Sequence, residues 1–397
     1  MKYYIIAGEA SGDLHGSNLI REIKKLDPSA QLRGWGGDLM REAGAEIVKD
    51  YRELAFMGFT EVVRNLPTIL KNIKFCKTDI QVFNPDAVIF IDYPGFNLRI
   101  ADWARNAGFK TIYYISPQVW AWKESRVKSI RENIDKMLVI LPFEKAFFEK
   151  WHYETEYVGH PLVEVIERFR QSPESQRPPD IFLTGIQKSV PPVQPLVALL
   201  PGSRKQEILK KLPVMLEASR SFPDFQFVVA EAPGQEASFY DEILKPFPLA
   251  GRVRNQTYSL LSHARAACVT SGTATLETAL FGVPEVICYK GSRISYQIAK
   301  RLIKVKYISL VNLIMDKPVV KELIQDEMNV KNIVEELKKL ISDQATRIRL
   351  QKDYADLRSL LSQGGNASKK AATLIVKFLS DNPAPTVEQP GSPSFNL

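Results

Sequence analysis

Short apolar runs, each followed by a loop of small residues and a longer amphipathic stretch, constrain the fold of this chain most strongly. The runs cover residues 3–7, 87–91, 111–115 and 137–141 in the first half, and 196–200, 225–230, 267–270 and 286–289 in the second. Such runs are typical of buried parallel strands whose crossover helices cover both faces of a sheet. The sequence therefore predicts an α/β fold with parallel sheets.

A proline-rich segment, 171–195, separates the two sets of runs. Its six prolines are incompatible with the interior of a helix or sheet, so we expect an interdomain linker there. At roughly 150 residues per domain, 397 residues fit two or three domains. The predicted division is a Rossmann-like domain over 1–170, the linker over 171–195, a second Rossmann-like domain over 196–355, a C-terminal helix over 356–380 and a disordered tail over 381–397.

The ionisable residues narrow the functional classes only partly. Lys and Arg total 53 against 45 Asp and Glu, a net charge of +8 that suits an anionic ligand, an anionic membrane surface or nucleic acid. Nucleic-acid binding usually needs a denser basic stripe than this chain carries. The three cysteines are too few for a disulfide framework, and the four histidines lack metal-ligand spacing. We therefore expect reduced thiols and no zinc site.

The location of the protein is predicted from its apolar segments. None approaches 18 uninterrupted apolar residues, the length typical of a transmembrane helix. The N-terminal apolar run, 3–7, is too short for the core of a signal peptide. Both observations favour a cytoplasmic protein.

The loop 8–13 follows the first predicted strand, and ligands of open parallel sheets bind at the carboxyl ends of strands. Its small residues let the backbone approach a ligand, and the next helix offers free N–H groups near Glu9, Ser11 and Gly12. A tight turn in which Ser11 or Asp13 caps the helix explains the loop equally well.

Asp92 ends the apolar run 87–91 and is a candidate base, because a carboxylate there could take a proton from a hydroxyl nucleophile. Taken alone, a turn or helix-capping aspartate is the simpler explanation. The aromatic cluster 113–122 follows the next run and fits either a sugar- or lipid-facing wall or ordinary core packing.

Two loops of the second half favour a phosphate site. Gly202 and Ser203 expose backbone N–H groups, and the guanidinium of Arg204 suits phosphate oxygens. A second loop ends a predicted strand at a helix start, which is a ready anion site; its residues are Ser271, Gly272 and Thr273. Glu277, one turn into that helix, could bind ribose hydroxyls or simply complement the helix dipole.

Missing motifs exclude two other phosphate-binding devices. The chain has no Gly-x-x-x-x-Gly-Lys-Ser/Thr loop, which excludes a P-loop nucleoside triphosphatase. It also has no Asp-x-Asp pair to clamp a diphosphate through a metal. Arg204 and helix N-termini would then have to neutralise a leaving diphosphate.

The stretch 56–83 mixes apolar and basic residues. This pattern suits a helix lying on an anionic membrane, although a buried amphipathic helix with a solvated basic face explains it too. The apolar candidates for membrane or acyl-chain contact are Phe56, Met57, Phe59, Val62, Leu66, Ile69, Leu70 and Ile73.

The order and spacing of these motifs resemble those of the lipid-A-disaccharide synthases, from the first strand to about Leu379. The segments that carry the resemblance are 8–13, 34–37, 91–92, 116–122, 141–144, 158–161, 200–204, 270–277 and 309–312. The resemblance implies a GT-B glycosyltransferase of two Rossmann-like domains facing across a cleft, with a C-terminal helix returning to the first domain. It also implies an inverting reaction without metal or other cofactor.

The reaction implied joins UDP-2,3-diacylglucosamine to 2,3-diacylglucosamine 1-phosphate (lipid X), giving lipid A disaccharide 1-phosphate and UDP. By the same resemblance Asp92 is the base for the acceptor hydroxyl, and Arg204, Glu277 and Asn312 bind the donor or act in catalysis. The first domain would hold the acceptor near Glu9, Ser11 and Gly12. The protein would associate peripherally with the cytoplasmic surface of the inner membrane; the oligomeric state is not implied.

Some positions depart from the family pattern. The family usually has an acid where this chain has Gly95, which concentrates the role of base on Asp92. It usually has proline where this chain has Asp38, Val311 and Lys321. Three alternatives stay open: a UDP-N-acetylglucosamine epimerase, the glycosyltransferase of peptidoglycan synthesis, or a non-enzymatic two-lobed binding module.

Overall fold

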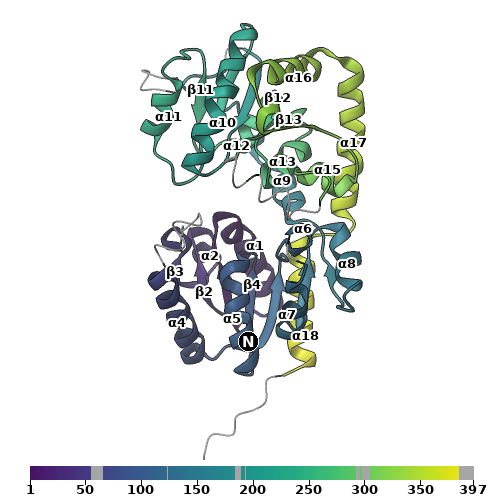
Figure 1. Ribbon diagram of the computed structural model, residues 1–397. Coiled ribbons are helices and arrows are strands. Elements are labelled where there is room, and N and C mark those ends of the chain that lie inside the picture. The colour runs from purple at the N-terminus through teal and green to yellow at the C-terminus, as the bar shows by residue number, and fades with distance from the viewer. Residues whose placement is uncertain are drawn as a thin grey trace, which may run out of the picture.

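Two sheets of seven strands each organise the chain in the computed structural model. The structure describes residues 1–54, 66–122, 124–183, 189–192, 194–291, 296 and 305–383. Figure 1 shows the first sheet below, in purple and blue, and the second above, in teal and green. The α/β fold with two largely parallel sheets is therefore confirmed.

The first sheet is entirely parallel, in the order β3-β2-β1-β4-β5-β6-β7. Its strands are β1 Lys2–Ala7, β2 Gln31–Gly36, β3 Glu46–Asp50, β4 Ala87–Ile91, β5 Lys110–Tyr114, β6 Lys136–Val139 and β7 Glu156–Tyr157. Its helices are α1 Ala10–Leu26, α2 Asp38–Glu42, α4 Leu66–Phe83, α5 Pro94–Asn106, α6 Val119–Trp122, α7 Arg126–Asn133 and α8 Pro142–Glu149. The strand order reverses between β1 and β4, the place where open parallel sheets bind ligands.

The second sheet has the order β14-β13-β12-β9-β10-β11-β8, with only β8 antiparallel. Its strands are β8 Phe182–Leu183, β9 Leu196–Leu200, β10 Gln226–Ala230, β11 Gly251–Val253, β12 Ala264–Val269, β13 Glu285–Tyr289 and β14 Lys321–Ile324. Its helices are α10 Lys205–Ala218, α11 Ala237–Leu244, α12 Thr257–His263, α13 Thr273–Leu280, α15 Leu310–Met315 and α16 Val330–Ser342. The edge strand β8 lies inside the proline-rich segment expected to be a linker.

Alternating burial explains why β1 forms at the centre of its sheet. Tyr3, Ile5 and Ala7 face the core that includes residues of α1, whereas Tyr4 and Ile6 face the opposite core that includes residues of α4. All five side chains are fully buried. A strand covered on both faces reads as a continuous apolar run, which is the pattern of 3–7.

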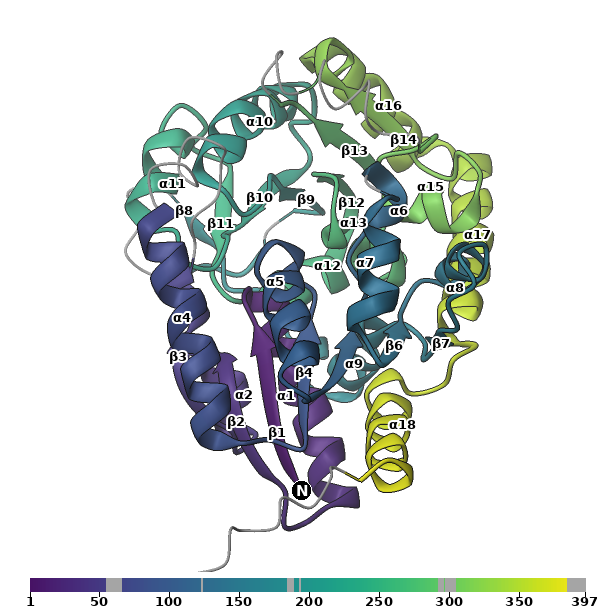
Figure 2. The same cartoon turned by 60° about the horizontal axis from the view of Figure 1, so that its bottom comes forward.

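The chain crosses between the two sheets twice. Helix α9, Pro161–Gln171, leads from the first sheet to the second, and α17, Gln344–Ser362, leads back toward the first. Helix α18, Ala367–Asp381, then packs against α1 of the first sheet, as the yellow ribbon in Figures 1 and 2 shows. The C-terminal helix therefore returns to the first domain, as expected.

The two crossings touch at a pair of glycines. A Cβ atom on Gly364 would lie 2.0 Å from the backbone nitrogen of Gly159. Beside this contact, the hydroxyl of Tyr157 donates to the carbonyl of Leu360 at 3.1 Å, and the N–H of His160 donates to that of Leu361 at 3.1 Å. Backbone packs directly on backbone here, so the crossings leave no room for a side chain.

We expect Gly364→Ala to lower the melting temperature sharply, because the methyl group would collide with backbone that cannot rotate away. Overpacking a tight contact costs about 1–3 kcal/mol, or several degrees of melting temperature. Gly95→Ala is the matched control, because a Cβ on Gly95 meets nothing within 4 Å and its φ is not positive. Calorimetric scans in which the two variants melt together would contradict this view of the crossing.

Candidate active site

The loops that leave β1 and β4 meet at the switch point of the first sheet. A Cβ atom on Gly8 would lie 2.3 Å from the ring of Tyr93, so the ring covers this glycine directly. Glu9 follows Gly8, and Asp92 precedes Tyr93. The structure therefore brings the predicted acceptor loop and the predicted base to the same place.

The backbone at Asp92 is strained and firmly held. Asp92 and Tyr93 have φ values of 43° and 49°, in the left-handed region that residues other than glycine rarely adopt. The carbonyl of Asp92 accepts hydrogen bonds from the hydroxyl of Tyr113 at 2.5 Å and from Nδ2 of Asn97 at 2.7 Å. A non-glycine residue held in the left-handed region costs about 1–3 kcal/mol of folding free energy, and such backbone strain clusters at functional sites.

Burial raises the pKa of the Asp92 carboxyl, and the charges of Glu9 and, more weakly, Glu144 add to this increase. Together they bring the pKa to about 7. The N–H of Tyr93 opposes the shift by binding the ionised form. A carboxylate whose pKa lies near neutral pH is a better proton acceptor than an ordinary surface aspartate. The electrostatics thus suit Asp92 to general-base work.

Glu144 joins two of the family segments, and the sequence alone did not mark it as a site residue. It is 1% exposed and accepts hydrogen bonds from the hydroxyl of Ser116, from Nε1 of Trp120 at 3.2 Å and from the N–H of Leu141 at 2.9 Å. Burial raises its pKa to about 7 despite these bonds. An acid at the third residue of a helix, as Glu144 is in α8, is a sequence signal of a helix start. Only the tertiary structure shows that its carboxylate fixes the loop at Ser116.

The predicted acceptor loop differs in detail from its expected turn. Glu9 precedes α1 at the N-cap position without a side-chain capping bond, and Ser11 is exposed. Asp13 is buried and accepts from the N–H groups of Gly37 at 2.7 Å and Met40 at 3.0 Å. It therefore caps α2 rather than α1, and ties the loop to the family segment 34–37.

A chain of alternating charges runs from the first loop predicted to bind phosphate, 202–204, into α10. Arg204, exposed at the start of α10, donates to Glu207 at 3.2 Å, and Glu207 also lies 3.5 Å from Nζ of Lys211. Lys211 is 2% exposed and donates to the hydroxyl of Thr270 at the end of β12. The i, i+3 and i, i+4 spacings signal these ion pairs, but the link to Thr270 is tertiary.

The second phosphate loop begins α13. Gly272 has a φ of 133° with open space where a Cβ would stand, and Thr273 begins the helix in an exposed position. The hydroxyl of Ser271 donates to the carbonyl of Ile308 at 2.6 Å. Lys211 connects this loop to the first one through Thr270, and Ser271 connects it to the segment that leads into α15, which carries Asn312.

Glu9 and Arg204 connect the two halves of the site electrostatically. The guanidinium of Arg204, from the second half, opposes the increase that burial causes in the pKa of Glu9. Glu9 in turn raises the pKa of Asp92. Glu9 therefore interacts electrostatically both with Asp92 of its own predicted domain and with Arg204 of the other.

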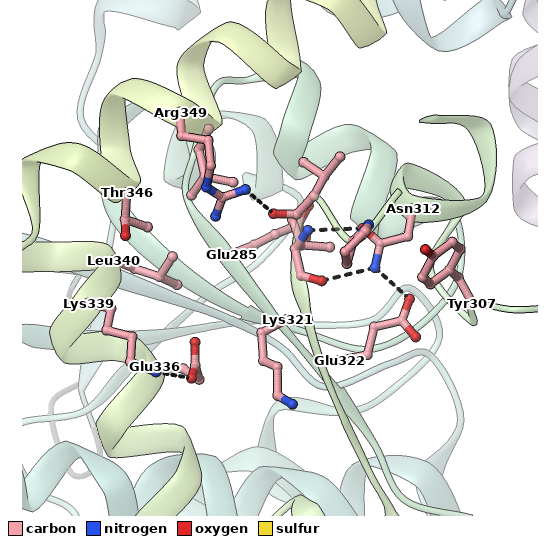
Figure 3. A pocket seen from close by; sticks show the side chains of 14 residues that line it. Glu285, Tyr307, Asn312, Lys321, Glu322, Glu336, Lys339, Leu340, Thr346 and Arg349 are labelled. Carbon is pink, nitrogen blue, oxygen red and sulfur yellow. Dashed lines mark hydrogen bonds and ion pairs between the residues drawn. The ribbon is translucent and has the colours of Figure 1, made fainter. Parts of the chain in front are cut away.

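Asn312 occupies a different environment from the other predicted donor residues. It is 1% exposed; its Nδ2 donates to the carbonyl of Val320 and to Glu322, both at 2.9 Å, and its Oδ1 accepts from the N–H of Val320 at 3.0 Å. Figure 3 shows these bonds beside a cavity of about 360 Å³ that Glu285 also lines. The amide thus holds α15 against β14, and the segment that leads into α15 is held at the second loop by the bond from Ser271 to Ile308.

The residues expected to contact a membrane are only partly described. Phe56, Met57, Phe59 and Val62 lie outside the described residues, as does the side chain of Leu66. On α4, Ile69 and Ile73 are half-buried and Leu70 is 58% exposed. In the described part of the chain, no group of three or more His, Cys, Asp or Glu residues could hold a metal ion.

Sequence comparisons place the chain in a family. Residues 3–376 match the model of the lipid-A-disaccharide synthetases. A lipid-A-disaccharide synthase from Geobacter metallireducens is 39% identical over 384 residues, which cover 94% of this chain and 96% of that protein. One from Syntrophus aciditrophicus is 40% identical over 382 residues, covering 94% and 97%.

Solved structures show the same fold at low sequence identity. A UDP-GlcNAc 2-epimerase from Neisseria meningitidis bound to UDP-GlcNAc superposes with a TM-score of 0.64 at 12% identity, covering 96% of this chain and all of that one. The glycotransferase of kitacinnamycin gives 0.61 at 15% identity, covering 95% and 98%. These neighbours support the two-domain GT-B architecture, and the sequence matches decide among its members: the chain belongs to the lipid-A-disaccharide synthase family, the GT-B glycosyltransferases of lipid A biosynthesis.

Proposed function

We propose that this enzyme transfers a 2,3-diacylglucosaminyl group from UDP to the 6-hydroxyl of 2,3-diacylglucosamine 1-phosphate, with inversion at the transferred carbon. The observation that carries the proposal is the family match over residues 3–376. The substrates themselves follow from the resemblance. Two observations support these substrates. Lys211 links the two loops suited to bind a diphosphate, and the pKa of the Asp92 carboxyl is raised to about 7.

In this reaction each half of the site has a separate task. Asp92 accepts the proton of the acceptor hydroxyl as its oxygen attacks the sugar carbon, and the bond to UDP breaks at the same carbon. Arg204 and the N–H groups of the Gly202–Ser203 and Ser271–Thr273 loops bind the departing diphosphate. Glu277 accepts hydrogen bonds from the ribose hydroxyls. Lys211, buried between the loops, adds positive charge and holds them together.

An epimerase is the main alternative reaction, because the fold is shared with UDP-GlcNAc 2-epimerases. Identity of 12% carries only the fold to this chain. The two reactions differ in what they require: an epimerase converts its UDP-sugar alone, whereas the transferase needs an acylated acceptor.

The decisive experiment incubates the protein with radiolabelled UDP-2,3-diacylglucosamine, with and without lipid X, and separates the products by thin-layer chromatography. We expect a labelled disaccharide phosphate only when both lipids are present. A matched reaction receives radiolabelled UDP-GlcNAc alone. Conversion of that sugar, or no disaccharide from the two lipids, would refute the proposed reaction.

We also propose that α4 rests on the cytoplasmic surface of the inner membrane, where acylated substrates reside. Large apolar side chains are exposed on this helix: Leu70 is 58%, Phe75 45% and Val82 79% exposed, and Lys71 and Lys74 are exposed among them. Exposed apolar groups beside lysines suit an anionic interface. No helix within the described ranges has the length and apolarity to span a bilayer.

The double variant Leu70→Ser/Val82→Ser should weaken binding to vesicles that contain anionic lipid. Burying such side chains is worth about 1.5–3 kcal/mol each when complete, so losing two partly buried contacts should reduce partitioning roughly tenfold or more. Leu209→Ser/Leu249→Ser is the control, because those leucines are 48% and 69% exposed in the second half. Sedimentation with vesicles measures both, and equal binding of the two double variants would rule out α4 as the contact.

A further inference from the structure

We propose that Tyr258 is a positioning residue of the donor site: its hydroxyl holds the Glu277 carboxylate in place for the ribose hydroxyls of a UDP-sugar. The hydroxyl donates to Oε1 of Glu277 at 3.1 Å, which leaves Oε2 for ribose. Both side chains are half-buried. The inference rests on the proposed function, in which Glu277 accepts those hydroxyls.

Packing fixes the ring that carries this hydroxyl. The ring centroid of Tyr258 lies 5.5 Å from that of Phe169 and 5.2 Å from that of Phe281. The ring of Phe169, near the end of α9, also packs against that of Phe281, with the two ring centroids 5.9 Å apart. Because three rings touch one another, the hydroxyl of Tyr258 has little freedom to leave Glu277.

The helix that carries Glu277 is anchored at its other end by both chain crossings. Arg170 of α9 and Arg358 of α17 donate to the carbonyl of Leu280, at 2.8 and 2.7 Å. Two cations at the C-terminus of α13 complement its dipole as well as binding its last carbonyl. Arg358 also lies 3.6 Å from Glu167 on α9, so the crossings are tied to each other. Tyr258 therefore acts on a helix whose axis is already fixed, and what it adds is the orientation of one carboxylate.

The charge state of the pair follows from its surroundings. Burial raises the pKa of Glu277, and the Tyr258 hydroxyl opposes that increase by binding the ionised form. Among the charged groups on the packed helices, Arg170 and Arg358 bind the main chain of α13 one turn away, and Glu167 of α9 lies 3.6 Å from Arg358. Burial and the neighbouring carboxylate raise the pKa of Tyr258 itself, so its hydroxyl keeps its proton. Removing the hydroxyl should let Glu277 take up a proton at a higher pH than in the wild type.

The test measures UDP affinity by titration calorimetry at a series of pH values, on the full chain and on Tyr258→Phe. We expect the variant to bind UDP about tenfold more weakly near neutral pH, and its loss of affinity on acidification to begin at a higher pH. KM for the UDP-sugar should rise in parallel while kcat stays within about threefold. Tyr153→Phe is the control: it removes a comparable hydroxyl bond, to the carbonyl of Ile134 at 2.9 Å, in the first half.

A double-mutant cycle separates positioning from general stability. In a Glu277→Gln background, Tyr258→Phe should weaken UDP binding little further, because the carboxylate it orients is already gone. The role of Tyr258 would be overturned if Tyr258→Phe bound UDP with wild-type affinity and lost that affinity at the same acidic pH as the wild type. It would also be overturned if the effects of Tyr258→Phe and Glu277→Gln on UDP binding were fully additive. A wild-type protein that does not bind UDP would overturn the donor assignment itself.

Discussion

Asp92→Asn is expected to lower kcat by at least about 100-fold while the UDP-sugar still binds. Asparagine keeps the shape of the side chain but cannot accept the acceptor's proton, and a positioned base typically contributes about 10²–10⁴-fold. The main-chain bonds from Tyr113 and Asn97 reach the carbonyl of residue 92 and survive the substitution. The variant should therefore fold, with a cooperative melt near that of the wild type. Initial rates with both lipid substrates measure the effect.

The pH profile gives the same assignment a second test. A base works only when ionised, and the pKa of Asp92 is raised to about 7. The wild-type rate should therefore increase as the pH rises through about 7 and fall below it. In Asp92→Asn the residual rate should lack this acid limb, because the group that titrates has been removed.

Two further variants bear on Asp92. Asp102→Asn changes an exposed aspartate of α5 and should leave kcat unchanged. Gly95 has open space where a Cβ would stand, so Gly95→Asp can introduce the acid usual in the family. If Asp92→Asn alone keeps near wild-type turnover, Asp92 is not the required base; if adding Gly95→Asp restores lost turnover, a carboxylate at this turn is what the reaction requires.

Arg204→Ala is expected to reduce kcat by roughly two to three decades. Electrostatic groups aimed at developing charge are typically worth about 3–4 kcal/mol, and Arg204 stands at the N-cap of α10, directly after Gly202 and Ser203 of the loop proposed to bind the diphosphate. The loss should fall on kcat more than on KM, because the negative charge of the leaving diphosphate grows in the transition state. Steady-state kinetics with varied UDP-sugar separates the two constants.

Arg220→Ala provides the matched comparison for Arg204. Both arginines are more than half exposed, and each pairs with a glutamate three residues away, at 3.2 Å for Arg204 and 2.9 Å for Arg220. Losing an exposed ion pair costs at most about 1 kcal/mol of stability, so Arg220→Ala should retain normal turnover. An unchanged kcat in Arg204→Ala, or activity that depends on added Mg²⁺, would show that another group neutralises the diphosphate.

Several strands were not visible as apolar runs, for physical reasons. Strand β2 carries glycine and arginine within its six residues, and β3 and β14 lie at sheet edges with mostly half-buried or exposed side chains. Edge strands bury one face at most, so their sequences need not be continuously apolar. The short strand β8 lies in the proline-rich segment, and its extended conformation is stabilised by pairing with β11 rather than signalled by its own residues.

The sequence by itself determined the α/β class and the central strands, because a strand buried on both faces has to be apolar throughout. It also determined which loops follow those strands, and hence the candidates Glu9, Asp92 and Arg204. Only the tertiary structure decided which side chains meet: the carboxylate of Glu144 at Ser116, the ammonium of Lys211 at Thr270 and the hydroxyl of Tyr258 at Glu277. Each pair joins residues 19 to 59 positions apart. Such contacts depend on how helices pack on the sheets, which no local pattern of residues encodes.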